Sequence, residues 1–190
     1  MASRAVLLRH GATEWSLTGQ HTGRTDIPLV EQGREQARAA GHALEGMRFA
    51  QVLASPLQRA WETATLAGFG PREEPDLMEW DYGSFEGKTS AEIREEHRGW
   101  TLWTDGVPGG ERAAEVGRRA DRVIEQVRRT QGDTLLVAHG HILRVLTARW
   151  LGLPPAAGRL FALDAGSLCV LGWEHEAPVV SRWNVGAPLS

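Results

Sequence analysis

The chain has 190 residues, of which 42% are hydrophobic, and a formal net charge of −3. This length suits a single domain over residues 1–190, because domains commonly hold about 100–200 residues. The small negative charge argues against general affinity for nucleic acid or anionic membrane. The first apolar run is too short for a signal peptide, and no stretch reaches the ~20 apolar residues of a membrane span. The single cysteine, Cys169, excludes an intramolecular disulfide and suits a reducing compartment, so we expect a soluble cytoplasmic protein.

The first third of the chain is predicted to alternate strands and helices. An apolar run predicts a buried strand over 4–9, and a polar, Gly-rich loop follows over 11–28. This loop is longer than the usual connection of about 4–6 residues, and long ordered loops are often functional. Small and charged residues predict a helix over 30–45, and residues 49–54 form the second strand. Ser55-Pro56 is typical of a helix N-cap followed by proline at the first helical position.

The rest of the chain continues the alternation and then ends in strands. The expected elements are an irregular segment over 75–87, a short helix over 90–97, a broken Trp/Gly/Pro segment over 99–110, a charged helix over 111–131 closed by Gly132, a strand over 134–138, an apolar helix over 142–151, and a final pair of strands over 168–173 and 179–183 forming a hairpin or sheet edge. Such alternation predicts an α/β fold, a three-layer α/β/α sandwich with a mainly parallel sheet covered on both faces.

Two of the predicted strands end in a histidine followed by a glycine. The first strand runs into Arg9-His10-Gly11, and the strand over 134–138 runs into His139-Gly140. Ligands of open α/β sheets bind at the carboxyl ends of the strands. If these two strands are neighbours, both histidines therefore belong to one site.

The charges around these histidines favour an anionic ligand. A buried Arg9 needs a partner of opposite charge, and Arg59 is expected near a helix N-terminus, where the dipole favours anions over cations. Taken alone, His10 suits a nucleophile, a general base, a metal ligand or a satisfied core residue, and Arg59 suits an exposed surface position. A metal site fits poorly, since no carboxylate or thiol stands at ligand spacing and the arginines repel cations. We therefore expect a pocket for a phosphoryl group.

Four motifs in order resemble the histidine phosphatase superfamily, in its phosphoglycerate mutase-like branch. They are Arg9-His10-Gly11 with Thr22-Gly23, Ser55-Pro56-Leu57-x-Arg59-Ala60, Glu79-x-x-Tyr82-Gly83-x-x-Glu86-Gly87, and Ala138-His139-Gly140. The loop sequence from Gly19 to Asp26 is most similar to the sedoheptulose bisphosphatase and sugar phosphatase subgroup. The resemblance implies a phosphoglycerate mutase-like fold, and catalysis without a metal or other cofactor.

The resemblance also implies a role for each matching residue. His10 becomes a phosphohistidine, and Arg9, Arg59 and His139 hold the phosphoryl oxygens, with His139 serving best as an imidazolium beside the phosphate. Glu79 is the proton donor, helped by the phosphate charge, which favours a protonated carboxyl group; Glu14 and Asp81 are alternatives. The substrate contacts implied or inferred nearby are Gly11, Ser16, Thr22, Gly23, Arg24, Tyr82 and Gly140, of which Ser16 stands where many relatives have asparagine. Arg24 would bind a second phosphate or a carboxylate, or be an exposed loop residue.

The acceptor of the phosphoryl group is expected to be water. Ser90 stands at the position matching the mutase lysine, and residues 87–111 lack a clear pair of arginines. We therefore predict a phosphatase acting on small phosphorylated metabolites, with a phosphoglycerate mutase or a catalytically silent regulatory module as alternatives. Residues 99–110 are either a mobile lid or a fixed flap, and His21 and His141 border the pocket. No nucleic-acid or membrane partner is expected, and the sequence permits a homo-oligomer without specifying one.

Overall fold

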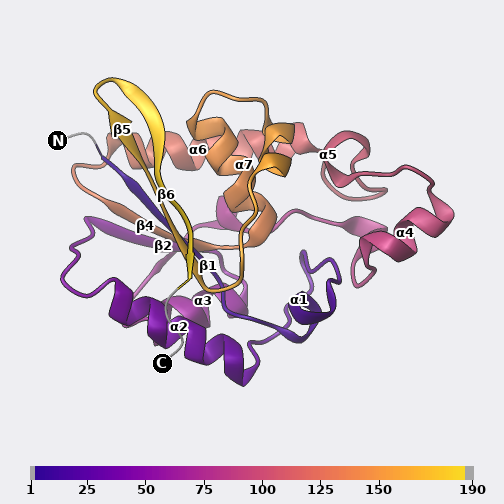
Figure 1. Ribbon diagram of the computed structural model, residues 1–190, viewed down its shortest axis with the longest axis horizontal. Coiled ribbons are helices and arrows are strands. Elements are labelled where there is room, and N and C mark those ends of the chain that lie inside the picture. The colour runs from indigo at the N-terminus through magenta and orange to yellow at the C-terminus, as the bar shows by residue number, and fades with distance from the viewer. Residues whose placement is uncertain (1–2, 187–190) are drawn as a thin grey trace.

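A computed structural model describes residues 3–186 and contains one six-stranded sheet (Figure 1). The strand order is β3-β2-β4-β1-β5-β6, and the strands are β1 (Ala5–Arg9), β2 (Gln51–Ala54), β3 (Arg72–Glu73), β4 (Thr134–Ala138), β5 (Ser167–Glu174) and β6 (Ala177–Gly186). The first four are mutually parallel, whereas β5 and β6 pair antiparallel. β1 and β4 lie side by side, with Arg9 opposite Ala138.

Helices cover both faces of the sheet, which explains why the central strands are mostly apolar. Helices α2 (Glu31–Ala43) and α3 (Gln58–Leu66) cover one face, and α6 (Ala113–Arg129) and α7 (Gly140–Trp150) cover the other (Figure 1). Successive residues of β1 point to opposite faces: Leu8 packs in the core beneath α2 and α3, and Leu7 in the core beneath α6 and α7. The predicted three-layer α/β/α architecture is confirmed.

Most predicted elements exist, with shifted ends. The strand over 134–138 matches β4 residue for residue, the last two strands form the expected hairpin, and the predicted helix over 90–97 is α4 (Ser90–Glu96). The long loop contains a short helix, α1 (Glu14–Thr18), and the broken segment contains α5 (Leu102–Asp105). The charged helix, α6, ends before Thr130 rather than at Gly132, and the apolar helix, α7, already begins at Gly140.

The predicted N-cap at Ser55 is wrong. Helix α3 begins at Gln58, with Leu57 as its flanking residue. The Ser55 hydroxyl accepts a hydrogen bond from the Leu57 amide at 3.3 Å and bonds to His139. The Ser55 hydroxyl thus bonds to the residue that follows β4 and does not cap α3.

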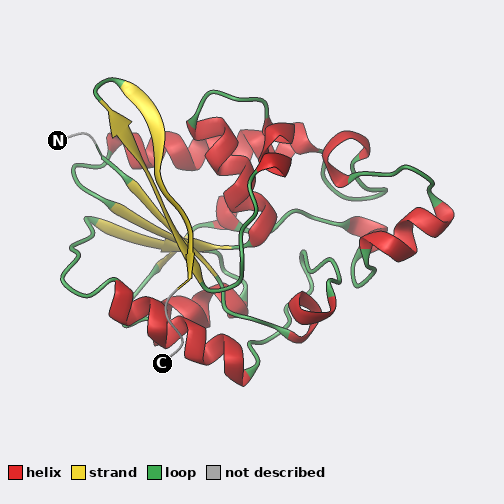
Figure 2. Cartoon of the chain, in the orientation of Figure 1, coloured by secondary structure: helices red, strands yellow, loops and turns green. Residues whose placement is uncertain are grey.

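The chain between β3 and α6 forms an irregular extension beside the ends of β1 and β4. It holds the 3-10 helices η1 (Pro75–Leu77) and η2 (Gly83–Phe85) together with α4 and α5, joined mostly by loops (Figure 2). Trp80, Phe85 and Trp100 are buried in the main core, so this extension is packed onto the domain. A further 3-10 helix, η3 (Pro155–Leu160), follows α7. No helix within residues 3–186 has the length and apolar character needed to cross a membrane.

Candidate active site

A cavity of about 180 Å³ opens where β1 and β4 end. Its lining consists of Arg9, His10, Ser16, Gly19, Gln20, His21, Thr22, Glu79, Tyr82, Gly140, His141, Arg144 and Leu163. The parallel pairing of the two strands brings the two predicted histidines together, since the His10 amide donates to the Ala138 carbonyl at 2.9 Å. The ring centroids of His10 and His139 lie 5.1 Å apart, in an edge-on arrangement.

His10 is held as a neutral imidazole with one free nitrogen. Its Nδ1 lies 2.7 Å from the Gly11 carbonyl oxygen, which can only accept, so Nδ1 carries the proton. Burial lowers the pKa of His10 well below its ordinary value, and the nearby Arg59 and Arg9 lower it further. Nε2 therefore keeps its lone pair, which is the form that attacks phosphorus.

His139 has the opposite arrangement at the same nitrogen. Its Nδ1 accepts a hydrogen bond from Arg59 Nε at 3.1 Å, and its Nε2 donates to the Ser55 hydroxyl at 2.7 Å. Burial, followed by the charge of Arg59, lowers the pKa of His139 well below its ordinary value. The hydrogen bond from Arg59 thus favours a neutral ring at His139, and the imidazolium expected beside a phosphate stays a prediction.

The two arginines expected to bind phosphate have different surroundings. Arg59 is fully buried and does not line the cavity; beyond His139, it donates to the backbone carbonyls of Thr22, Gly23 and Thr25 at 2.9–3.1 Å. Arg9 lines the cavity and donates to the Leu163 carbonyl, while its buried Nε has no hydrogen-bond partner among the described residues. Arg9 therefore retains a donor for an anion, whereas the donors of Arg59 bond mostly to His139 and to the loop over 22–25.

Glu79 is buried against the start of α7. Its Oε1 accepts hydrogen bonds from the amides of Trp80 and Ile142, and its Oε2 accepts one from the amide of His141, each at 2.9 Å. A carboxylate offers about four acceptor positions, so the remaining one belongs to Oε2.

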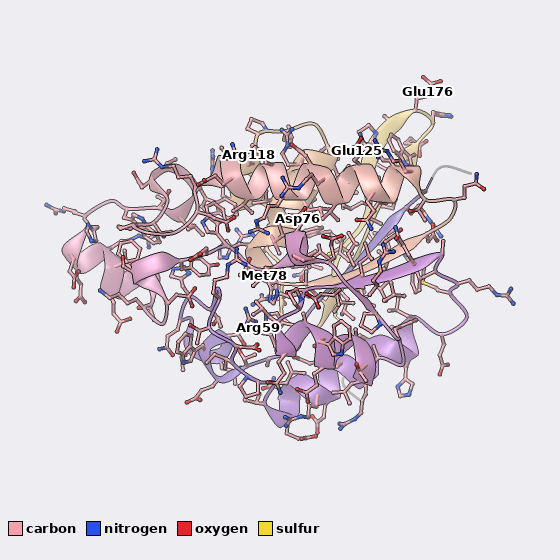
Figure 3. All side chains as sticks on the ribbon, turned by 180° about the vertical axis from the view of Figure 1, so that it is seen from behind. Arg59, Asp76, Met78, Arg118, Glu125 and Glu176 are labelled. Atoms are coloured by element: carbon pink, nitrogen blue, oxygen red, sulfur yellow. The ribbon has the colours of Figure 1, made fainter. Side chains whose placement is uncertain are left out.

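Two residues that sequence reasoning missed hold the Glu79 segment in place. Arg119 pairs with Glu111 at 2.8 Å and donates to the carbonyls of Asp76 and Met78 at 2.7 and 2.8 Å. Glu111 in turn accepts from the Asp81 amide at 3.0 Å. Figure 3 shows Asp76 and Met78 between α6 and Arg59. The sequence held one signal for Arg119: it follows Val116 by about one helical turn and therefore lies on the apolar face of α6.

Four predicted substrate contacts lie at the cavity: Ser16, Thr22, Tyr82 and Gly140. Ser16 is already engaged, because its hydroxyl donates to the Thr13 carbonyl and accepts from the Thr13 amide. The Tyr82 hydroxyl lies 2.6 Å from His141 Nδ1. Burial raises the pKa of Tyr82 well above its ordinary value and lowers the pKa of His141, so the phenol donates. His21 and His141 border the cavity, as expected.

Three other predicted contacts are directed elsewhere. The Gly11 amide donates to the Thr63 hydroxyl at 3.2 Å, and the Gly23 amide to Glu86 at 3.1 Å. The Arg24 guanidinium contacts the Met78 sulfur at 2.7 Å and lies 3.6 Å from Asp81. None of the three lines the cavity, and neither do the alternative acids Glu14 and Asp81. Contacts with residues far along the chain therefore hold all three groups away from the cavity.

A lining residue not foreseen from the sequence is Arg144, from the second turn of α7. It stands among apolar residues in a largely apolar helix, which was a usable signal. Within residues 3–186, no group of three or more His, Cys, Asp or Glu side chains is arranged to hold a metal ion.

The fold and site together define a class of protein: an α/β protein whose neighbouring parallel strands end in buried histidines and an arginine, where such folds bind anionic ligands. The model of the histidine phosphatase superfamily (branch 1) matches residues 5–186. The chain belongs to this superfamily, and the enzyme class predicted from the sequence is confirmed.

Similar proteins carry phosphatase names. The chain is 43% identical over 177 residues to an acid phosphatase of Mycobacterium tuberculosis, covering 90% of this chain and 87% of that one. It is 33% identical over 187 residues to sedoheptulose 1,7-bisphosphatase of Saccharomyces cerevisiae, covering 80% and 69%. A solved structure of an open reading frame from Mycobacterium tuberculosis superposes with a TM-score of 0.92 at 40% identity, covering 98% and 99%.

Proposed function

We propose that this protein hydrolyses phosphomonoesters of small metabolites through a phosphohistidine at His10. His10 Nε2 forms a bond to phosphorus as the bond from phosphorus to the ester oxygen breaks. Glu79 delivers the proton that the leaving oxygen needs. A water oxygen then forms a bond to phosphorus as the bond from phosphorus to His10 Nε2 breaks, the Glu79 carboxylate accepts the water's proton, and inorganic phosphate leaves. The atoms balance without a metal ion or other cofactor.

The observation that carries this proposal is the hydrogen bond from His10 Nδ1 to the Gly11 carbonyl. This bond fixes the tautomer of the buried His10 ring, with the proton on Nδ1. Nε2 is therefore unprotonated, and the nucleophile needs no separate base. Arg9 supplies a cation with a free donor in the same cavity, where charge develops during transfer. The phosphatase names of the relatives and the small cavity are consistent with this chemistry.

The test replaces His10 with asparagine, which keeps a polar side chain but removes the nucleophile. We expect kcat for p-nitrophenyl phosphate to fall by at least about 1,000-fold, as it does when a catalytic nucleophile is lost. Intact-mass measurement of the wild-type protein, quenched during turnover, should show one added phosphoryl group that the variant lacks. His175→Asn is the control, because that side chain is 92% exposed. Full activity in His10→Asn would exclude the mechanism, and an inactive wild-type protein would favour a silent module.

Water rather than a second substrate hydroxyl is the proposed acceptor. Ser90, at the position matching the mutase lysine, carries no charge, and its hydroxyl lies 3.1 Å from His21 Nε2. A phosphoglycerate assay that follows both inorganic phosphate and the isomeric product distinguishes the two acceptors. We also infer a single domain and a cytoplasmic location, on the length, the core and the single cysteine.

A further inference from the structure

Arg144 is a cation that lines the cavity. Its guanidinium lies over the Trp103 ring, 4.7 Å from the centroid, and donates to the carbonyls of Gly158 and Arg159 at 3.2 and 3.4 Å. No carboxylate within residues 3–186 lies within 4.0 Å of it, whereas Arg119 and Arg149 both have one at 2.8 Å. A half-buried arginine without a carboxylate favours an anionic ligand.

Arg144 lies away from the end of the cavity where Arg9 would bind the phosphoryl group. Gly140 begins α7 next to the Arg9 guanidinium, and Arg144 follows one helical turn later. Four residues of helix span about 6 Å, so the two arginines suit two anionic groups separated by a short carbon skeleton. His141 lines the cavity as well; its Nδ1 is bonded to Tyr82, so its Nε2 is the nitrogen that would meet a substrate hydroxyl.

We infer that Arg144 binds a second anionic group of the substrate, a carboxylate or a second phosphate. Trp103 supports one face of the guanidinium, and Nε and Nη2 donate to the two carbonyls, so Nη1 is the donor that would bind such a group. The sequence assigned this role to Arg24, but Arg24 faces Asp81 and Met78 instead. This inference rests on the proposed function, because it concerns the substrate class of the same site.

The experiment uses pairs of phosphate esters that differ in the second anion. Glycerol 3-phosphate is paired with 3-phosphoglycerate, and fructose 6-phosphate with fructose 1,6-bisphosphate; p-nitrophenyl phosphate serves as an ester without a second anion. Wild-type protein should give the higher kcat/KM on the second member of at least one pair. Arg144→Gln should lower that value about 10- to 100-fold, the range for losing a charged hydrogen bond, and change the values for glycerol 3-phosphate and p-nitrophenyl phosphate less than about 3-fold. Arg144→Lys should recover part of the loss.

Arg128→Gln is the matched control. The Arg128 guanidinium also lies over tryptophan rings, 5.2 Å from Trp150 and 5.3 Å from Trp173, but it does not line the cavity. This variant should leave every kcat/KM unchanged. Thermal midpoints of all variants show whether a loss comes from unfolding.

The outcomes separate the inference from the proposed function. A loss confined to 3-phosphoglycerate identifies a carboxylate as the second group, and a loss confined to the bisphosphate identifies a phosphate. Equal losses of Arg144→Gln on both members of each pair, or no wild-type preference in either pair, overturn the inference while His10-dependent hydrolysis stands. Absence of His10-dependent hydrolysis of any ester refutes the proposed function itself.

Discussion

His10 and His139 face each other and use the same ring nitrogen in opposite ways. Nδ1 of His10 donates to a backbone carbonyl, whereas Nδ1 of His139 accepts from Arg59. In each ring the partner of Nδ1 sets the tautomer, and so decides what Nε2 can do. In the proposed mechanism His10 attacks through its unprotonated Nε2, whereas Nε2 of His139 donates to Ser55. Two identical residues thus have different parts in one site.

Replacing Glu79 with glutamine should slow alkyl phosphates far more than aryl phosphates. An alkoxide needs a proton to leave, whereas nitrophenolate leaves without one, and general acid catalysis contributes about 10²- to 10⁴-fold. We expect kcat for an alkyl phosphate to fall by at least about 100-fold and kcat for p-nitrophenyl phosphate by less than about 10-fold. Steady-state kinetics on both esters measure the two losses.

The ratio of the two losses is the decisive quantity for Glu79. A glutamine amide group would meet backbone N–H donors at a position where the carboxylate accepts three hydrogen bonds. Some loss of stability, about 1–3 kcal/mol, therefore accompanies the change and affects both esters alike. Similar losses for the two esters would refute the proton-donor role.

The elements that carry the two histidines could be predicted from the sequence, because buried parallel strands are short apolar runs with clear ends. His10 and His139 each follow such a run directly, so strand pairing alone brings them together. The direction of Arg24 could not be predicted, since its neighbours Asp81 and Met78 come from a segment far along the chain. The start of α3 was missed because Ser55 bonds to His139, a contact that exists only after the sheet forms.

Close contact between β1 and α2 depends on two glycines. A Cβ on Gly11 would lie 2.1 Å from the Gly33 carbonyl oxygen, and a Cβ on Gly33 would lie 2.2 Å from the Ala12 carbonyl oxygen. In an open helix, Gly→Ala stabilises by about 0.5–1 kcal/mol. For Gly33→Ala we expect the opposite sign, a loss of about 1–3 kcal/mol, because backbone atoms must move apart. Urea unfolding measures this change in the free energy of unfolding.

Because Gly11 follows His10, Gly33→Ala should also displace the nucleophile and lower kcat. Gly70→Ala is the control: a Cβ there meets nothing within 4 Å, and its φ is not in the left-handed region. That variant should be neutral or slightly stabilising, with unchanged kcat. A Gly33→Ala protein as stable and active as the wild type would show that the helix can move away from β1 without cost.

Across the whole molecule, the active site concentrates histidines that must stay neutral. Burial is the leading cause that lowers the pKa values of His10, His139 and His141 well below the ordinary value of 6.5. Around them lie the cations Arg9, Arg59 and Arg144, which oppose protonation as well. The cation-rich cavity that suits a phosphoryl group is therefore also an acid-sensitive part of the fold.

Stability should fall as the pH drops below about 6.5. The unfolded chain binds protons at these three histidines from that pH downward, whereas the folded chain binds them only at much lower pH. Each such histidine contributes a slope of about 1.4 kcal/mol per pH unit, so three give about 4 kcal/mol per unit between the unfolded and folded pKa values. Denaturant unfolding in phosphate-free buffers from about pH 7.5 to 5.5 measures this slope above the range where most carboxylates titrate.

His141→Asn should reduce the slope by about 1.4 kcal/mol per unit, whereas the exposed control His175→Asn should leave it unchanged. An unaltered slope in His141→Asn would mean that His141 takes up its proton without unfolding, and that the neutral form is not enforced by the fold.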